Sequence, residues 1–256
     1  MYFTDQLNRK IFIPTPPKRI ISLVPSQTEL LVDLGLEDRI VGVTKFCIHP
    51  SSLRKAKTIV GGTKNYRMDI IESLKPDLII GNKEENEKEG VEELMEKYPV
   101  WMSDIYFLQD SVEMISKLGQ ILDVQESSKK IVDQLTADFA TPLTKKGTCI
   151  YLIWNDPMMV VGKHTFIDEM LTFSGFENLI KEKRYPSLTD HDLEHLEPEF
   201  ILLSSEPFPF KQKHLDEFQY KFPKAQVCLV DGEYFSWYGS RLLGAKKYFI
   251  ETFEEE

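Results

Sequence analysis

Residues 19–38 read RIISLVPSQTELLVDLGLED, and this stretch decides the fold. It opens with four apolar residues that favour a buried strand, namely Ile20, Ile21, Leu23 and Val24. An amphipathic run follows and stops at Gly35, which predicts a helix with Ser26 or Thr28 as its N-cap. The stretch therefore predicts a strand, a tight turn and a helix. In open α/β sheets the start of such a helix lies beyond the carboxyl end of the strand, where ligands bind.

The composition indicates a folded protein of one large or two small domains. The chain has 256 residues, of which 42% are hydrophobic and 28% charged, so it can build real cores. Its net charge of -10 argues against nucleic acid as a partner. Three cysteines without a CxxC pair predict neither a disulfide framework nor a zinc–thiolate site. No secretory signal, lipidation motif or apolar run long enough to span a bilayer is visible, which by itself predicts a cytoplasmic protein.

The second half of the chain repeats the order of the first. Residues 73–80, SLKPDLII, correspond to residues 195–202, HLEPEFIL, and each is a helix end, a proline and an apolar strand. The opening unit recurs as a strand at 150–153 and a helix at 166–173 that stops at Gly175. Matches in the same order predict a duplicated domain. We therefore expect an α/β fold of two similar lobes with parallel-rich sheets, joined by a long connecting helix, with a ligand cleft between them. The expected boundaries are residues 1–110, 111–142 for the connecting segment, and 143–256.

Two further elements follow from the pattern between these landmarks. Residues 82–97 are strongly charged with helical spacing, which predicts a helix over the whole stretch. The connecting segment has helical spacing that is interrupted near Asp123, which predicts two helices or one long helix with a break.

Four pieces of this sequence together resemble one family. They are PSQTELLVDLG at 25–35, LKPDLII at 74–80, the Val161-Gly162-Lys163 turn before a helix, and LEPEFILL at 196–203. Their order is similar to that of the helical-backbone (class III) solute-binding proteins of ABC importers, and within that family to the cobalamin-binding proteins. The resemblance covers about residues 19–250. It implies two α/β lobes bridged by a rigid helix, a ligand held between them, and a periplasmic or cell-surface location.

The stretch richest in potential ligand contacts is residues 231–241, DGEYFSWYGSR. Rings placed after a strand suit a large, flat, partly apolar ligand, and arginine can hydrogen-bond its carboxylate, amide or phosphate groups. The alternative is a loop or helix start whose rings complete the core of the lobe. The candidate residues are Phe235, Trp237, Tyr238 and Arg241.

Other loops add candidates. Trp154 follows the strand at 150–153 and either contacts ligand or holds the lobes together. Lys45 and Phe46 lie in a loop after an apolar strand, and a second loop has small residues that allow close approach to a ligand. Tyr185 falls where the cobalamin binders of the resembled family place an aromatic residue, although an ordinary surface loop is the alternative. The second loop contributes Thr63, Lys64 and Asn65.

The sequence predicts neither a bare-metal site nor an enzyme. Cys47 and His49 could reach one ion, but a transition-metal site needs three or four ligands, and the remaining histidines complete no recognisable set with them. A histidine as axial ligand to a chelated metal stays open. The sequence contains no GxSxG, Walker A, GxGxxG or HExxH pattern.

The resemblance also implies docking residues and partners. In this importer class one acidic residue on each lobe pairs with arginines of the membrane subunit, and the internal repeat points to Asp69 and to Asp190 or Asp192. The alternative is that these acids satisfy free amides at helix starts. We expect a monomer that captures a corrinoid such as cobalamin for an ABC importer, without a covalently bound cofactor. A ferric siderophore or haem binder of the same class is the alternative. From another class, the alternative is an intracellular two-lobed enzyme or a corrinoid-handling accessory protein.

Overall fold

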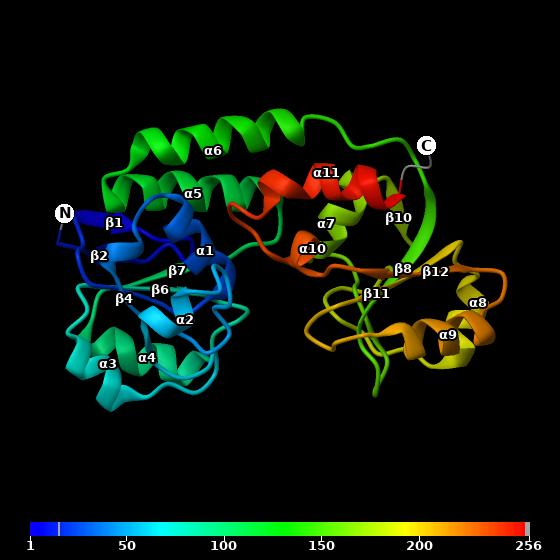
Figure 1. Cartoon of the computed structure of the whole chain (residues 1–256), viewed down its shortest axis with the longest axis horizontal. Helices are drawn as coiled ribbons and strands as arrows, with labels where there is room; N and C mark the ends of the chain where they lie inside the picture. The colour runs from blue at the N-terminus through cyan, green and yellow to red at the C-terminus, as the bar shows by residue number, and fades with distance from the viewer. Residues whose placement is uncertain (15, 254–256) are drawn as a thin grey trace. The chain divides into compact units, whose positions relative to one another are not determined.

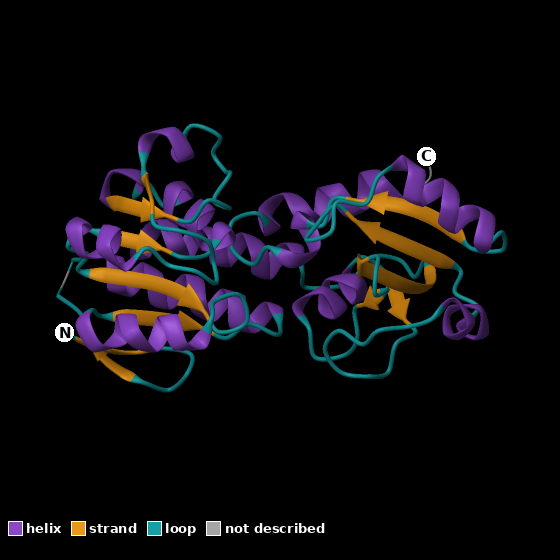
Figure 2. Cartoon of the chain, turned by 90° about the horizontal axis from the view of Figure 1, so that it is seen from below, coloured by secondary structure: helices purple, strands orange, loops and turns teal. Residues whose placement is uncertain are grey.

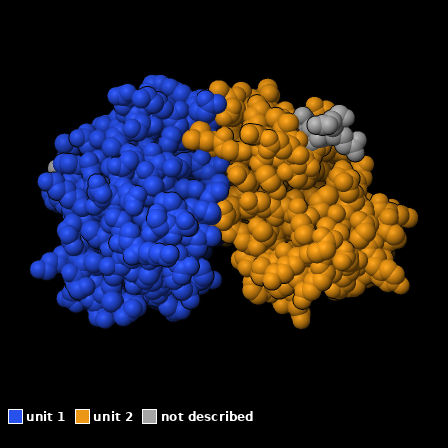
Figure 3. Space-filling view, viewed as in Figure 1, with its two compact units in different colours: residues 1–105, 109–136, 238–241 blue, residues 106–108, 137–237, 242–256 orange. Residues whose placement is uncertain are grey.

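The computed structural model describes residues 1–14 and 16–253 (Figure 1). The chain divides into two compact units, which Figure 3 colours separately. Unit 1 comprises Met1–Ile105, Gln109–Thr136 and Tyr238–Arg241, and unit 2 comprises Tyr106–Leu108, Ala137–Trp237 and the chain from Leu242 onward. Most of the predicted connecting segment thus belongs to unit 1, and the predicted boundaries at 110 and 143 stay a prediction.

Unit 1 is built on a parallel sheet with the strand order β5-β4-β3-β6-β7. The strands are β3 (Ile20–Ser22), β4 (Ile40–Val43), β5 (Thr58–Ile59), β6 (Leu78–Asn82) and β7 (Val100–Ser103). In Figure 1 helices α3 and α4 cover one face of this sheet, and α1 and α5 cover the other. The helices are α1 (Pro25–Asp33), α2 (Leu53–Ala56), α3 (Met68–Leu74), α4 (Lys88–Lys97), α5 (Leu108–Leu122) and α6 (Gln125–Asp138), with a short 3₁₀ turn η1 (Glu37–Arg39). A small antiparallel hairpin, β1 (Tyr2–Thr4) and β2 (Lys10–Phe12), precedes them.

Unit 2 repeats this plan with the strand order β10-β8-β11-β12, all parallel, and β9 pairs antiparallel with β8. The strands are β8 (Gly147–Trp154), β9 (Met159–Val160), β10 (Phe176–Asn178), β11 (Phe200–Ser204) and β12 (Gln226–Val230). The helices are α7 (Phe166–Phe173), α8 (Asp190–Leu196), α9 (Gln212–Lys221), α10 (Glu233–Ser236) and α11 (Leu242–Phe253). Helices α8 and α9 pack on one face of the sheet through Leu193 and Phe218. Figure 2 shows the strands of each unit lying side by side. The expected fold of two α/β lobes with parallel-rich sheets is confirmed.

The opening strand–turn–helix unit forms as predicted, except for its cap. Helix α1 begins at Pro25, and Val24 is the N-cap, so the prediction of Ser26 or Thr28 was wrong. Proline suits the first helical position because it has no N–H to leave unpaired and its φ is already helical. Thr28 Oγ1 instead donates to the Val24 carbonyl at 2.8 Å. Gly35 ends the helix with φ of 79°, as the glycine C′ position requires.

The internal repeat recurs in the backbone. Helices α3 and α8 have seven residues each, and both end at a residue in the left-handed region, Lys75 with φ of 47° and Glu197 with φ of 43°. A proline follows in each case and then a five-residue strand, β6 or β11. The glycine that follows α7, Gly175, has φ of 91° and corresponds to Gly35. The same local signals therefore build both sheets.

Two helix predictions need correction or completion. The predicted helix over 82–97 is shorter, because the Asn82 side chain accepts hydrogen bonds from the Glu84 and Glu85 amides at 2.8 and 3.1 Å and closes a turn. Helix α4 therefore starts at Lys88, with the Glu87 carboxylate as its N-cap. The connecting segment contains two helices, since Asp123 has φ of 58° between α5 and α6. Among the described residues, none of the helices has the length and apolar character needed to cross a membrane.

Candidate functional site

In unit 1 the loops after β4 and β5 lie next to each other at the carboxyl end of the sheet. The Lys45 ammonium lies 5.0 Å from the centroid of the Phe46 ring, and that ring is 48% exposed. The next loop closes on itself through a hydrogen bond from the Gly62 amide to the Asn65 carbonyl at 2.9 Å. A Cβ on Gly62 would lie 3.4 Å from the Phe46 ring, so the two loops are in contact. Together they form an exposed surface of one aromatic ring and cations, to which Lys64 also belongs.

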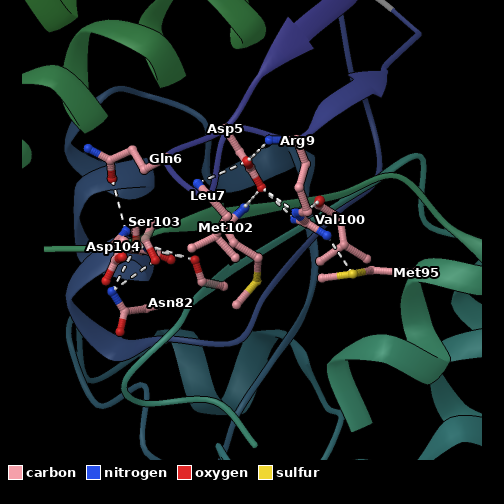
Figure 4. Close-up of polar contacts among 12 residues, drawn as sticks. Asp5, Gln6, Leu7, Arg9, Asn82, Met95, Val100, Met102, Ser103 and Asp104 are labelled. Carbon is pink, nitrogen blue, oxygen red and sulfur yellow. Dashed lines mark hydrogen bonds and ion pairs between the residues drawn. The ribbon is translucent and has the colours of Figure 1, made fainter. Parts of the chain in front are cut away.

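A buried polar network fixes this edge. The Asn86 side chain donates to the Thr63 carbonyl at 3.1 Å and accepts from the Asn82 amide at 2.8 Å, so it links the loops after β5 and β6. Asn82 in turn donates to Ser103 Oγ at 2.9 Å, at the end of β7. Figure 4 shows Asn82, Ser103 and Asp104 together at these strand ends. The Tyr66 hydroxyl donates to the Thr63 carbonyl at 2.7 Å, and burial raises the pKa of Tyr66 to about 12. These contacts hold Thr63 in place without engaging its hydroxyl.

Tyr238 and Arg241, which the sequence predicts to contact ligand, belong to unit 1 and bind acidic side chains within it. The Tyr238 hydroxyl donates to Glu85 Oε1 at 2.7 Å, and the ring is only 5% exposed. Burial raises the pKa of Tyr238 well above its usual value, so the hydroxyl keeps its proton. Arg241 donates through Nε and Nη2 to both carboxylate oxygens of Glu29, at 3.0 and 2.6 Å. Both side chains therefore have acidic partners within the protein. Glu85 lies on the loop that follows β6, and Glu29 lies on the helix that follows β3.

The other two candidates from residues 231–241, Phe235 and Trp237, lie in unit 2, where they are also buried. Phe235 is 0% exposed and packs on Tyr151 and Phe249, with ring centroids 5.2 and 4.8 Å apart. It is therefore a core residue in this structure, and its predicted contact with ligand stays a prediction. Trp237 is 7% exposed, and its indole Nε1 donates to Glu206 Oε1 at 2.9 Å. The alternative interpretation of this stretch, rings that complete a core, describes Phe235 better than a ligand contact does.

One accessible aromatic surface of unit 2 lies at the end of β8. Trp154 is 39% exposed, and its ring meets that of Phe208 edge-to-face at 5.6 Å. The Trp154 indole N–H donates to the Asp156 carbonyl at 3.0 Å, which fixes the ring. Phe208 follows β11, so both rings lie at the carboxyl edge of the second sheet. Sequence reasoning missed Phe208, although EPFPF at 206–210 is a post-strand aromatic run of the kind that drew attention to residues 231–241.

Tyr185 lies elsewhere in unit 2, beside a cation. The Arg184 guanidinium lies 5.5 Å from the Tyr185 ring centroid and 5.7 Å from that of Tyr106. The backbone of this segment is fixed by Gly162, whose amide donates to the Arg184 carbonyl at 2.7 Å. Tyr185 is therefore held in an aromatic–cation cluster, which the sequence did not indicate because Tyr106 is distant in the chain.

Glu206 is the buried ionisable group at the second sheet's edge. It accepts hydrogen bonds from Ser236 Oγ and Trp237 Nε1, yet burial raises the pKa of the Glu206 carboxyl, and the nearby carboxylates of Glu233 and Asp231 raise it further. A raised pKa in the folded state means that this group stabilises the protein most below the ordinary value of 4.5. That contribution is lost as the pH rises through the folded-state pKa.

Glu206→Gln is therefore expected to raise the melting temperature at pH 7 by a few degrees, and the gain is expected to shrink toward pH 4.5. Glutamine keeps an oxygen that accepts from Ser236 and Trp237 and removes the buried charge. The matched control is Glu199→Gln, because hydrogen bonds from Thr148 lower the pKa of the Glu199 carboxyl and the sign reverses. Melting curves between pH 4.5 and pH 8 test this pair. A gain for Glu206→Gln that is equal at all pH values would refute the burial argument.

The three predicted docking acids lie at matching helix starts. Asp69 is exposed in the first turn of α3, and Asp190 and Asp192 are exposed in the first turn of α8. Asp190 pairs with Lys221 at 3.1 Å, while Asp192 forms a capping box with Thr189, which holds the pKa of that carboxyl below its usual range. Asp192 accepts a hydrogen bond from the Thr189 amide at 2.8 Å, as the helix-start alternative expects, and the docking role of all three acids stays a prediction.

A separate pocket of about 300 Å³ lies in unit 1 beside β7 and α4. Figure 4 shows part of its wall, with Leu7, Met95 and Met102 near Arg9. None of the predicted ligand-binding residues lines it. Among the described residues there is also no group of three or more histidine, cysteine, aspartate or glutamate side chains that could hold a metal ion.

The chain is similar in sequence to proteins of one known family. The profile of the periplasmic binding protein family matches residues 20–220, well over half of the chain. An uncharacterized ABC transporter substrate-binding lipoprotein, YvrC of Bacillus subtilis (strain 168), is 27% identical over 218 residues, covering 77% of this chain and 67% of that protein. The vitamin B12-binding protein of Vibrio campbellii is 25% identical over 201 residues, covering 75% and 73%.

The fold is also similar to that of a solved structure. The periplasmic heme-binding protein RhuT from Roseiflexus sp. RS-1, in its apo form, superposes with a TM-score of 0.79 over 93% of this chain and 99% of that one. At 19% identity this likeness shows the shared fold alone. The match over residues 20–220 shows the family. This chain belongs to the periplasmic binding protein family, the class that the sequence resemblance indicated.

Proposed function

We propose that this protein captures a corrinoid such as cobalamin and delivers it to an ABC importer. Two observations support the ligand class. The matched relative of Vibrio campbellii is a vitamin B12-binding protein. Each unit also offers an exposed aromatic surface at the carboxyl edge of its sheet, Phe46 in unit 1 and Trp154 with Phe208 in unit 2. The second observation matters most, because rings provide large contact area to a macrocycle at little entropic cost.

Polar groups complete the contact. The Thr63 hydroxyl, the Asn65 side chain and the Lys64 ammonium lie on the loop beside Phe46, where they can meet the amide groups that surround a corrin ring. Capture requires no covalent chemistry, and no residue acts as a catalyst in this proposal. Asp69 on α3 and Asp190 or Asp192 on α8 would meet arginines of the membrane subunit. The matched relatives include a lipoprotein, so we place the protein outside the cytoplasm; the cytoplasmic alternative has no support from them.

A ferric chelate or haem is the second candidate ligand. Cations accompany the rings, Lys45 over Phe46 in unit 1 and Arg184 between Tyr106 and Tyr185 in unit 2. An anionic ligand uses such cations, whereas a corrinoid depends more on the rings. The structural likeness to a heme-binding protein keeps this candidate open.

Thermal-shift titrations of purified protein with cyanocobalamin, haem and a ferric siderophore distinguish these ligands. A ligand present at 100 times its Kd stabilises the folded protein by about 2.7 kcal/mol. We expect saturable stabilisation by cyanocobalamin. Stabilisation by haem or the siderophore alone would keep the family and overturn the corrinoid. No response to any of the three would contradict the proposed class of function.

Phe46→Ala and Trp154→Ala are each expected to weaken cyanocobalamin binding by about tenfold, as loss of one stacked ring predicts. Phe12→Ala is the matched control, because Phe12 is 58% exposed on the N-terminal hairpin and is not among the candidate residues. Absorbance titrations measure the three affinities. Equal weakening by all three substitutions, or by none, would remove these rings from the proposed site.

A further inference from the structure

Helix α8 presents two imidazoles side by side. His191 and His195 are four residues apart, which places them on one face of the helix, and both are exposed. Their ring centroids are 4.1 Å apart with an interplanar angle of 66°. Two imidazole nitrogens that share one ion at bonds of about 2.0–2.1 Å lie about 3 Å apart. The observed ring separation meets this requirement with small side-chain rotations.

The hydrogen bond of His195 fixes which of its nitrogens can bind an ion. His195 Nδ1 lies 2.7 Å from the His191 carbonyl oxygen. A carbonyl only accepts, so Nδ1 carries the proton and donates, and Nε2 of the neutral ring keeps its lone pair. A ring N–H bonded to a backbone carbonyl is the arrangement that orients metal-binding histidines in general. The ring is therefore prepared for coordination through Nε2.

The charges around the pair favour a cation. Asp192 is exposed on the same helix, one residue after His191 and three before His195. Glu194 lies between the two histidines in the sequence and is exposed. Lys221 on α9 forms ion pairs with Asp190 and Glu217.

We propose that His191 and His195 chelate one divalent transition-metal ion, such as Ni²⁺, Cu²⁺ or Zn²⁺, at the surface of α8. Imidazole suits these three ions, and the usual order of affinities puts Cu²⁺ first. Two protein nitrogens bind the ion, and water supplies the remaining one or two of the three or four ligands that such an ion needs, since the described residues contain no group of three or more side chains that could hold it. The site uses none of the candidate ligand-binding residues, so its test does not depend on whether the protein binds a corrinoid.

Equilibrium dialysis against NiCl₂, without any organic ligand, tests the proposal. The wild-type chain is expected to bind one Ni²⁺ per chain at pH 7.5, where the loss of binding in each histidine variant is measured. His191→Ala and His195→Ala are each expected to weaken binding at least tenfold. Both side chains are exposed, so the melting temperatures are expected to stay unchanged.

Two variants separate coordination from a structural role. His195→Asn keeps an N–H donor for the His191 carbonyl but has no equivalent of Nε2, so it is expected to bind Ni²⁺ as weakly as His195→Ala. His164→Asn removes an exposed imidazole elsewhere in unit 2 and is expected to bind like the wild type. Rescue of binding by His195→Asn, or equal losses in the His164 variant, would overturn the assignment. Unchanged binding in both alanine variants would overturn it as well.

Discussion

Gly61→Ala is expected to destabilise unit 1 by about 3 kcal/mol and to displace the loop that carries Thr63, Lys64 and Asn65. Gly61 has φ of 124°, which side chains rarely adopt, and a Cβ there would lie 2.2 Å from the Asn65 carbonyl oxygen. Backbone strain and a clash with backbone therefore add together. Urea unfolding of the variant measures the loss, and the same variant is expected to bind cyanocobalamin less tightly.

Two other glycines separate these causes. Gly35→Ala introduces backbone strain but no clash, because φ is 79° and nothing lies within 4 Å of the added Cβ. This variant is therefore expected to lose about 1 kcal/mol of folding stability. Gly162→Ala introduces a clash but no strain from a positive φ, because the added Cβ would lie 2.2 Å from the Glu182 carbonyl oxygen. Because Gly162 holds the segment that carries Tyr185, its substitution should disturb the cluster in unit 2. A loss for Gly61→Ala no larger than that for Gly35→Ala would contradict the argument.

Glu29→Ala is expected to cost about 2–3 kcal/mol, because it leaves the Arg241 guanidinium without its bidentate partner. Both side chains are 15% exposed, so water can replace the carboxylate only in part. Burial raises the pKa of Glu29 although Arg241 lowers it, which shows that desolvation opposes the pair. Denaturant unfolding measures this loss of stability. Arg241→Lys is expected to lose part of the same stability, because an ammonium lacks the planar fork of N–H donors that forms both hydrogen bonds to the Glu29 carboxylate.

Asp133→Ala is the matched control for this pair. Lys129 and Asp133 form an ion pair on α6, but the two side chains are 72% and 61% exposed. Exposed pairs of this kind contribute little, so no measurable change is expected. Comparable losses for Asp133→Ala and Glu29→Ala would mean that the Arg241–Glu29 pair contributes no more than a surface pair. Residues 238–241 would then have to be held in place within unit 1 by other contacts.

The elements that could be predicted are those specified locally. The strand before Pro25, the glycine stops at Gly35 and Gly175, and the proline after each seven-residue helix lie within a few residues of the structure they determine. The same signals appear in both halves of the sequence, so the sequence alone predicts a duplicated fold. The short start of α4 was missed because the side-chain hydrogen bonds of Asn82 decide it, and these compete with the helical pattern.

The candidate site was predictable only in part, because the availability of each side chain to a ligand depends on partners far away in the chain. Arg241 looked available from its sequence context, but Glu29, 212 residues away, takes its guanidinium. Phe235 looked like a ligand contact, but the rings of Tyr151 and Phe249 enclose it. Trp154 and Phe46 remain exposed, and composition alone could not distinguish them from the rings that became core.

Equilibrium dialysis of the purified protein against cyanocobalamin, followed by the absorbance of the corrinoid, tests the central claim most directly. We expect saturable binding of one cyanocobalamin per chain, weakened in Trp154→Ala and Phe46→Ala and unchanged in Phe12→Ala. Absence of any bound corrinoid at ligand concentrations of about 100 μM, well above the Kd values expected of a specific binding protein, would contradict it.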